Sequence, residues 1–343
     1  MTQRKNILIA AVLGVSALLI WFFFFKKDNT KETDFGQNAD PELAALSAML
    51  EQNPKSDSLL YARARLYYEA EAYDEALLDI NEALKIDSMQ PRYYHLLADV
   101  FLDYARPNDS RRAIEVLKLA SNRFPGRIPT LLKLSEFQLI VKKHGDALAT
   151  LDQILQRDPQ NAEAFYMAGR VALDKGDTLA AVSSFEKSVN IDAENADAWV
   201  FLGRIFSNRN NPKAIQFFDN ALRVDSTYLE AREFKGAFYK RRGEFEQAFQ
   251  IYRDIILRNP DYSNAYFDMG MIYLEQDSLP NAYTHFDLAI KTDPIFVKAY
   301  YYRGLAAEKQ GNTAAALADY KQAYGMLPSF EEAKAAKERL EKK

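Results

Sequence analysis

The sequence predicts an all-α solenoid, a stack of helix–turn–helix units, that follows a single membrane-spanning helix. The first observation is a repeated glycine, spaced by 34, 33, 34 and 34 residues at Gly169, Gly203, Gly236, Gly270 and Gly304. The second is a long uncharged apolar run near the N-terminus, over residues 7–25. A period of this length indicates stacked repeats that contact mainly their neighbours, and such arrays present surface more often than they perform chemistry.

The glycines need a packing explanation. A glycine inside an apolar helical pattern destabilises the helix by about 1 kcal/mol relative to alanine. Five glycines at the same repeat position therefore need a contact that offsets this cost. We expect the two helices of each repeat to approach closely at this one small position. The earlier copies keep the position small with Ala64, Ala98 and Ser135.

The repeat resembles a known signature once its residues are aligned. Trp199-x2-Leu202-Gly203-x2-Phe206 is followed by Ala214-x3-Phe218 and Asp225, and the later copies agree. This pattern resembles the tetratricopeptide repeat (TPR), and the resemblance covers about 274 of 343 residues, 57–330. It implies a superhelical solenoid of about eight repeats: 57–90, 91–127, 128–161, 162–195, 196–228, 229–262, 263–296 and 297–330.

Two repeats depart from the usual length, both between their paired helices. The second carries three extra residues near Arg106 to Asp109, and the fifth is one residue short near Asn208 to Pro212. Turn-forming residues at the surface tolerate such changes. The sequence leaves two readings open, a loop without functional consequence and a partner-specific loop.

Helices are predicted at both ends of the array. Residues 40–56 resemble the second helix of a half-repeat that stops at Asn53-Pro54. Residues 331–343 are polar, rich in alanine and strongly helical by propensity. An array needs a terminal helix with a polar outer face, so this segment is predicted to be a capping helix.

The apolar run predicts a transmembrane signal anchor at residues 7–25. Nineteen helical residues span roughly 29 Å, close to the ~30 Å hydrocarbon core of a bilayer. A short basic N-terminus, residues 1–6, precedes it, and a polar linker, residues 26–39, follows it. The run ends in four phenylalanines and two lysines, which offer no small-x-small cleavage site. The chain contains no cysteine, which excludes anchoring through a lipidated N-terminal cysteine.

The numbers of positive charges on the two sides of the span are nearly equal, so they hardly favour either orientation. Arg4 and Lys5 precede the span, and Lys26, Lys27 and Lys31 follow it. A short basic N-terminus before an apolar run resembles a bacterial signal anchor. We therefore expect a single-pass membrane protein with a cytoplasmic N-terminus and the array outside the cytoplasm, in the bacterial periplasm. The alternative is an array that faces the cytoplasm.

Composition argues against nucleic acid and against catalysis. The whole chain carries a net charge of −4 and residues 1–27 carry +4, so residues 28–343 carry −8. Nucleic acid favours a basic stripe. The three histidines, His95, His144 and His285, occupy different positions in different repeats, and no glycine-rich phosphate loop occurs. We expect no enzyme activity, no cofactor and no metal site.

The TPR resemblance implies that the first helix of each repeat lines a concave groove for protein or peptide segments. Side chains expected there toward the N-terminus include Tyr61, Arg65, Tyr68, His95 and Asp99. The middle of the groove is expected to hold Leu132, Glu136, Tyr166, Arg170, Arg204 and Asn208. The C-terminal end is expected to hold Lys240, Phe267, Met271, Leu274, Tyr301 and Leu305.

Two groups within this set suggest a binding mode. Arg170 and Arg204 occupy equivalent places in adjacent repeats and could clamp a carboxylate or stack on a peptide, or they could simply pair with local acids such as Glu163 and Asp174. The apolar residues at the C-terminal end, from Phe267 to Leu305, form either a partner site or a surface covered by repeat packing and the cap.

One known TPR mechanism is disfavoured by the sequence. Chaperone-binding members hold a C-terminal carboxylate with lysines on successive first helices. The position of the first lysine is occupied here by Tyr61, His95, Leu132, Tyr166, Val200, Glu233, Phe267 and Tyr301.

The leading hypothesis is a membrane-anchored adaptor that supports the assembly or secretion of envelope proteins. The alternatives are an oligomeric scaffold of a membrane complex, which would make the chain a homo-oligomer, and a cytoplasm-facing regulator of a membrane-associated enzyme. Proteins of the last kind carry a cysteine-based metal module, which this chain lacks.

Overall fold

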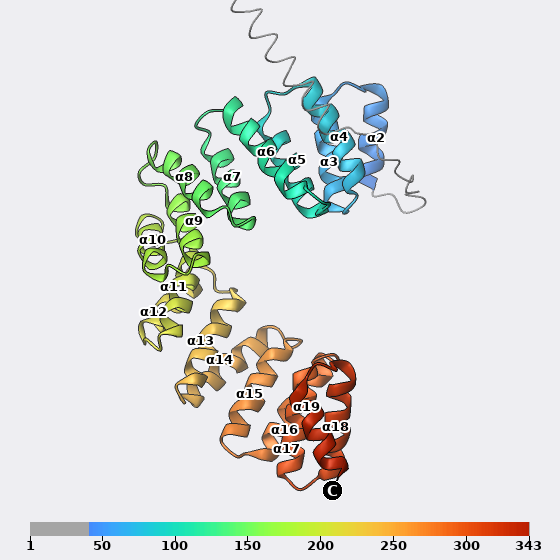
Figure 1. Cartoon of the computed structure of the whole chain (residues 1–343), viewed down its shortest axis with the longest axis vertical. Coiled ribbons are helices and arrows are strands. Elements are labelled where there is room, and N and C mark those ends of the chain that lie inside the picture. Colours follow the sequence, from blue (N-terminus) through green and yellow to red (C-terminus); the bar gives the residue numbers. More distant parts are fainter. Residues whose placement is uncertain (1–40, 343) are drawn as a thin grey trace, which may run out of the picture. The chain divides into compact units, whose positions relative to one another are not determined.

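The computed structural model describes residues 41–342, and these contain eighteen α-helices and no strand. The all-α solenoid prediction is confirmed for this part of the chain. The described residues divide into two compact units, one within Met1–Pro159 and the other within Gln160–Lys343. In each unit the helices follow one another as packed pairs (Figure 1). No helix among the described residues is long and apolar enough to cross a membrane. The predicted anchor, residues 7–25, lies outside the described residues.

Unit 1 contains seven helices within residues 41–159: α2 (Pro41–Gln52), α3 (Asp57–Glu69), α4 (Tyr73–Ile86), α5 (Pro91–Tyr104), α6 (Asp109–Arg123), α7 (Ile128–Ile140) and α8 (His144–Leu155). Unit 2 contains eleven within residues 160–342: α9 (Ala162–Asp174), α10 (Thr178–Ile191), α11 (Ala196–Asn208), α12 (Lys213–Val224), α13 (Leu229–Arg241), α14 (Phe245–Arg258), α15 (Ser263–Glu275), α16 (Leu279–Thr292), α17 (Val297–Lys309), α18 (Thr313–Met326) and α19 (Glu331–Glu341).

The odd-numbered helices from α3 to α17 are the first helices of the predicted repeats, and they share one side of each unit. Every helix packs against the next one along the chain within its unit. First helices also contact the first helix of the following repeat, as α3 does with α5, α5 with α7, α11 with α13, α13 with α15 and α15 with α17. Side chains from neighbouring repeats therefore meet on the surface of the first helices.

An aromatic ring explains each repeated glycine. A Cβ atom added to Gly203 would lie 2.5 Å from Cε1 of Phe218, on the paired helix α12. Gly169 meets Phe185 in the same way, at 2.6 Å. Carbon atoms in contact are about 3.5–4.0 Å apart, so the ring occupies the space of a methyl group. The expected close approach of paired helices is confirmed at these positions.

In unit 1 the same site is filled by different residues with a similar total size. Ala64 and Ala98 carry the methyl group that the glycines lack, and the partner positions on the second helices are held by Ile80 and Leu117 in place of a ring. All four side chains belong to one buried cluster. A larger residue on the first helix is thus balanced by a smaller one on the second, as dense packing of a core requires.

Every turn between paired helices contains a residue in the left-handed region. Gly176, Gly243 and Gly311 occupy this place in three repeats, with φ of 80°, 72° and 83°. Other repeats place Glu71, Lys142, Asn210 or Asp277 there, with φ between 52° and 59°. A residue other than glycine in this conformation costs roughly 1–2 kcal/mol. The tight turn is therefore retained at an energetic cost in most repeats, because they lack a glycine at this position.

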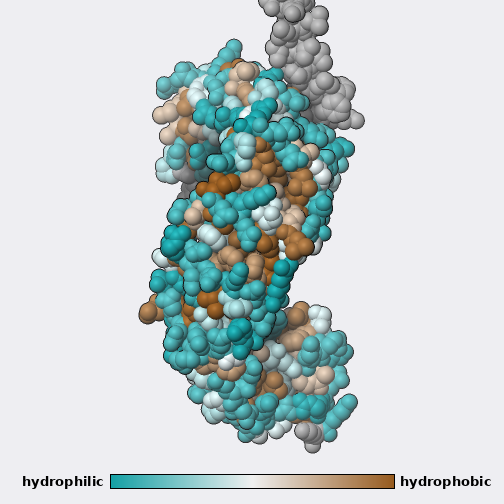
Figure 2. Space-filling view, turned by 90° about the vertical axis from the view of Figure 1, so that its left-hand side faces the viewer, coloured by the Kyte–Doolittle hydropathy of each residue, from teal (hydrophilic) through white to brown (hydrophobic). Residues whose placement is uncertain are grey.

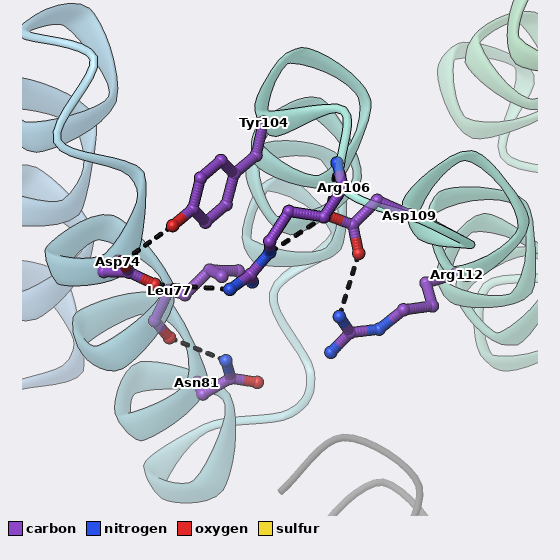
Figure 3. A network of polar contacts seen from close by, with 7 residues as sticks. All are labelled: Asp74, Leu77, Asn81, Tyr104, Arg106, Asp109 and Arg112. Atoms are coloured by element: carbon purple, nitrogen blue, oxygen red, sulfur yellow. Dashed lines mark hydrogen bonds and ion pairs between the residues drawn. The ribbon is translucent and has the colours of Figure 1, made fainter. Parts of the chain in front are cut away.

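A network of polar contacts surrounds the longer turn of the second repeat in unit 1 (Figure 3). Asp109 is completely buried and accepts a hydrogen bond of 2.9 Å from Nη1 of Arg112. Arg106 reaches both Asp109, at 3.4 Å, and Asp74 on α4, at 3.5 Å. Tyr104 donates a 2.7 Å hydrogen bond to the same Asp74. Pro107 and Asn108 of this turn are exposed, as expected for a surface turn, while Arg106 links buried Asp109 at the start of α6 to Asp74 on α4.

The two predicted end helices pack against their neighbours. α2 lies within residues 40–56, contacts α3 and buries Leu50. α19 lies within residues 331–343, contacts α18 and buries Ala333, Ala336 and Leu340. The other face of α19 exposes charged residues such as Glu332 and Glu338. This amphipathic arrangement covers apolar residues of α18 at the end of unit 2.

Replacement of Gly203 by alanine should destabilise unit 2 by about 1–3 kcal/mol, because the new methyl group overpacks the ring of Phe218. The control is Gly325→Ala on α18, where no heavy atom lies within 4 Å of the added Cβ and helix propensity should give a gain of up to about 1 kcal/mol. Urea unfolding followed by circular dichroism measures both.

The double variant G203A/F218L reproduces the alanine–leucine pair of the second repeat. We expect it to be more stable than the sum of the two single effects, because the smaller side chain makes room for the methyl group. Strict additivity, or a neutral G203A, would show that this contact does not set the distance between the helices.

Candidate partner-binding groove

The central residues predicted for the groove form a continuous ladder of rings and guanidinium groups in unit 2. The ring of Tyr166 on α9 lies 6.1 Å from that of Phe201 on α11. The guanidinium carbon of Arg204 lies 5.5 Å from the Phe201 ring and 4.8 Å from the Phe234 ring on α13. Arg170 lies 5.7 Å from the centre of the Tyr166 ring. Three successive first helices are thus joined by cation–π and aromatic contacts.

Arg204, the arginine between two rings of this ladder, remains accessible. The side chain of Arg204 keeps 42% of its surface exposed, and its acidic neighbour Glu230 lies 3.8 Å away. Asn208, one turn further along α11, is exposed. A planar guanidinium held between two rings keeps its hydrogen-bonding edge available for a carboxylate or a peptide carbonyl. Sequence reasoning missed Phe201 and Phe234, although an aromatic residue recurs at their repeat position, as Tyr302 does in the last repeat.

An open hollow of about 570 Å³ adjoins this ladder. It lies at the N-terminal ends of α9 and α11, next to the loop that precedes α13. Two tyrosines, a short neutral stretch and five carboxylates line it: Tyr166, Tyr228, Asn195, Ala196, Glu163, Asp192, Glu194, Asp197 and Asp225. We call it the acidic hollow. Tyr228 donates a hydrogen bond to Asp197, and burial, with a further contribution from this hydrogen bond, raises the pKa of Tyr228.

The apolar residues predicted at the C-terminal end are partly used in packing. The ring of Phe267 lies 5.5 Å from Phe286 and 5.0 Å from Phe296. Met271 and Leu274 pack against the same cluster. Tyr301 lies 5.1 Å from Phe330, directly before the terminal helix α19, and Leu305 is half-buried. Repeat packing and the cap therefore cover part of this strip.

The remaining predicted groove residues have local partners. Lys240 on α13 forms an ion pair with Asp268 on α15. In unit 1, the Tyr61 ring lies 5.0 Å from Tyr93, and exposed Arg65 pairs with Glu69 at 2.9 Å. Within residues 41–342 no group of His, Cys, Asp or Glu is arranged to hold a metal ion.

Large apolar side chains that are exposed stand apart from one another. Leu179, Leu257 and Ile295 are 76–82% exposed and lie in three different repeats. Figure 2 shows one face of the molecule, on which hydrophobic patches are separated by hydrophilic residues. Scattered apolar residues are normal on protein surfaces, so they do not define a second site.

His95 of the predicted groove joins two repeats of unit 1. Its Nε2 lies 2.9 Å from Oγ1 of the buried Thr130 on α7. Beside this contact, Lys133 pairs with Asp99 at 2.7 Å. Burial, with a smaller effect of Lys133 and Arg127, lowers the pKa of His95 from 6.5 to about 4. At neutral pH the imidazole is therefore uncharged.

Unit 1 should lose stability as the pH falls from 6.5 toward 4. The unfolded chain binds a proton at His95 near pH 6.5 and the folded chain only near pH 4, so the contribution present above pH 6.5 is lost in this window. Relative to His95→Gln, the wild type should become less stable by about 1–2 kcal/mol between pH 7.5 and pH 5. Parallel denaturation curves at the two pH values measure the difference, and equal pH dependence in both proteins would contradict it.

Comparison with known proteins places this geometry in a family. A family profile described as tetratricopeptide repeat matches residues 34–91, 142–195, 166–228 and 284–329, together more than half of the chain. The chain is 28% identical over 161 residues to the probable UDP-N-acetylglucosamine–peptide N-acetylglucosaminyltransferase SPINDLY of Hordeum vulgare, covering 45% of this chain and 17% of that protein. It spans about a fifth of the length of the first such relatives.

Two solved structures show the same fold at low identity. The C-terminal part of a TPR protein from Cytophaga hutchinsonii gives a TM-score of 0.57 at 17% identity, covering 72% of this chain and 99% of that one. The type IV pilus biogenesis factor PilW gives 0.51 at 21% identity, covering 60% and 96%. With its repeated glycines, paired helices and profile match, the chain belongs to the tetratricopeptide repeat family.

Proposed function

We propose that this protein is a membrane-anchored adaptor whose first helices bind a segment of a partner protein. TPR proteins mediate protein–protein interaction. The observation that carries the proposal is the accessible ladder of Tyr166, Phe201, Arg204 and Phe234 across three repeats. Aromatic rings and arginine are the residues enriched at binding hot spots. The ladder offers both stacking surface and hydrogen-bond donors to a peptide.

The anchoring part of the proposal rests on the sequence. The uncharged run at residues 7–25 and the polar linker at 26–39 would hold the repeats near a bilayer. PilW, whose structure has a similar fold, is a type IV pilus biogenesis factor. A role of this chain in the assembly or secretion of envelope proteins would be of the same kind. That likeness concerns the fold, so the role is proposed from the anchor and the groove together.

A charge reversal in the ladder tests the binding site. The full-length variant R170E/R204E, with a photo-crosslinking residue at exposed Asn208, should capture partner protein about tenfold less than the wild type, because a guanidinium–carboxylate pair becomes a repulsion. The variant K213E/R253E changes the net charge equally on second helices, α12 and α14, and should leave capture unchanged. Equal capture by all three proteins would exclude the ladder as the site.

A topology measurement tests the anchor. An alkaline phosphatase joined after Lys343 should be active in bacterial cells, since the array is proposed to lie outside the cytoplasm. Removal of residues 7–25 should abolish this activity and release the fusion from membranes. Fluorescence of a reporter that matures only in the cytoplasm, joined at the same place, would reverse the proposed orientation.

A further inference from the structure

The first and the last helix of the described array differ in what they leave exposed. At the C-terminal end of unit 2, α19 packs on α18 and turns charged residues such as Glu332 and Glu338 outward. At the N-terminal end of unit 1, α2 lies beside α3 (Figure 1). It holds the place of a second helix, and among the described residues no first helix precedes it. An array end without a polar outer face leaves apolar surface uncovered.

The proline that follows each second helix shows which positions of α2 lack cover. Met49 stands five residues before Pro54 and is 52% exposed. In four other repeats the residue at this place is at most 1% exposed. These residues are Ile154, Ile255, Ala289 and Ala323. A position that the complete repeats bury is therefore open in α2.

Two further leucines of this end are less covered than their equivalents. Leu46 of α2 is half-buried, whereas Phe286, at the same place in its repeat, is completely buried and lies against Gly270 of its first helix. Leu66 of α3, two residues after Ala64, is also half-buried. Ile272, two residues after Gly270, is completely buried. The missing cover thus affects both helices at this end.

The uncovered surface of α2 is apolar and uncharged at its centre. Ala44, Ala45, Ala48 and Met49 are all exposed, and their spacing places them along one side of the helix. We call these four residues the open face. A face that meets its own copy across a two-fold axis must be self-complementary, and an uncharged centre avoids the repulsion that identical charges would cause.

The sequence directly before α2 is unsuited to cover the open face. Residues 26–39 contain one large apolar side chain, Phe35, among polar and charged residues. The outer side of α19 is also unsuited, because its charged residues would meet an apolar surface. Head-to-tail stacking of copies is therefore disfavoured, and the apolar surface that matches the open face is the same face of another copy.

The proposed anchor would bring two such faces together. Residues 26–40 join the apolar run at 7–25 to α2 and span at most roughly 50 Å. Copies in one membrane would hold their open faces at a similar height and at a raised effective concentration. Ala10 and Gly14 within the run have the small-xxx-small spacing on which membrane helices pair.

We propose that the open face of α2 is an isologous interface at which two copies of this chain form a dimer. The inference rests on the anchor of the proposed function for bringing the copies together and adds an interface separate from the groove. The ladder residues lie on α9, α11 and α13 of unit 2. A dimer would therefore carry two ladders, and a partner with two binding segments would be held by both.

Disulfide crosslinking tests the interface, because the chain contains no cysteine. Full-length A45C and A48C are oxidised separately in isolated membranes, whichever side the array faces. At least one of them should form a linked dimer, since a disulfide requires the two Cβ atoms to lie about 3.5–4.5 Å apart. The matched control A335C places the same residue at an exposed alanine of α19 and should crosslink about tenfold less.

A charge on the open face should separate the copies. M49E, added to A45C and to A48C, should lower the yield of linked dimer about tenfold, because two identical charges would meet at the interface. Met49 is already half exposed, so the fold should be kept, and circular dichroism checks this. The control L257E adds the same charge at a leucine of α14 that is 82% exposed and should leave the yield unchanged.

Other results would overturn the inference. Equal yields from the α2 variants and from A335C would show only random collision in the membrane, and an unchanged yield with M49E would place the contact elsewhere. A disulfide between mixed A48C and A335C copies would show head-to-tail stacking instead. Recovery of the chain outside the membrane fraction would contradict the anchor, while crosslinking of that soluble chain would still test the interface. Capture by R170E/R204E reports separately on the ladder.

Discussion

The contact between the two helices of a repeat, at one small residue, is the constraint on which the rest of the structure depends. In unit 2 the ring of a phenylalanine or tyrosine lies against a glycine, as Phe218 does against Gly203. In unit 1 Ala64 and Ile80 share the equivalent site. The summed volume of the two contacting residues is similar in both units, while the share that each helix contributes differs. The distance between paired helices can therefore stay similar along each unit.

This regularity brings the groove residues together. Because the two helices of every repeat contact each other at the same repeat position, equivalent residues on consecutive first helices lie beside one another. Tyr166, Phe201 and Phe234 can then form one ladder across three repeats, with Arg204 between two of the rings. In a solenoid each repeat contacts mainly its neighbours. The packing of the core therefore determines how the residues of the proposed binding surface are arranged.

The sequence was sufficient for features that repeat and insufficient for those that do not. The glycine period predicted the fold and the close approach of helices, because the same packing recurs in every copy. The ion pair of Lys240 with Asp268 was not predicted, since it joins residues of different repeats at unrelated positions. The burial of Asp109 was also not predicted: its carboxylate pairs with Arg106 and Arg112, a combination that no spacing rule indicates.

The ladder gives the proposed groove both contact area and charge. Arg170 lies beside the ring of Tyr166, and Arg204 lies between the rings of Phe201 and Phe234. A partner segment that places a carboxylate at Arg204 would be favoured over one that places a cation there, because like charges across an interface repel. Such repulsion discriminates between partners more than it adds affinity. The charge pattern would thus select the partner, while the aromatic rings supply most of the contact area.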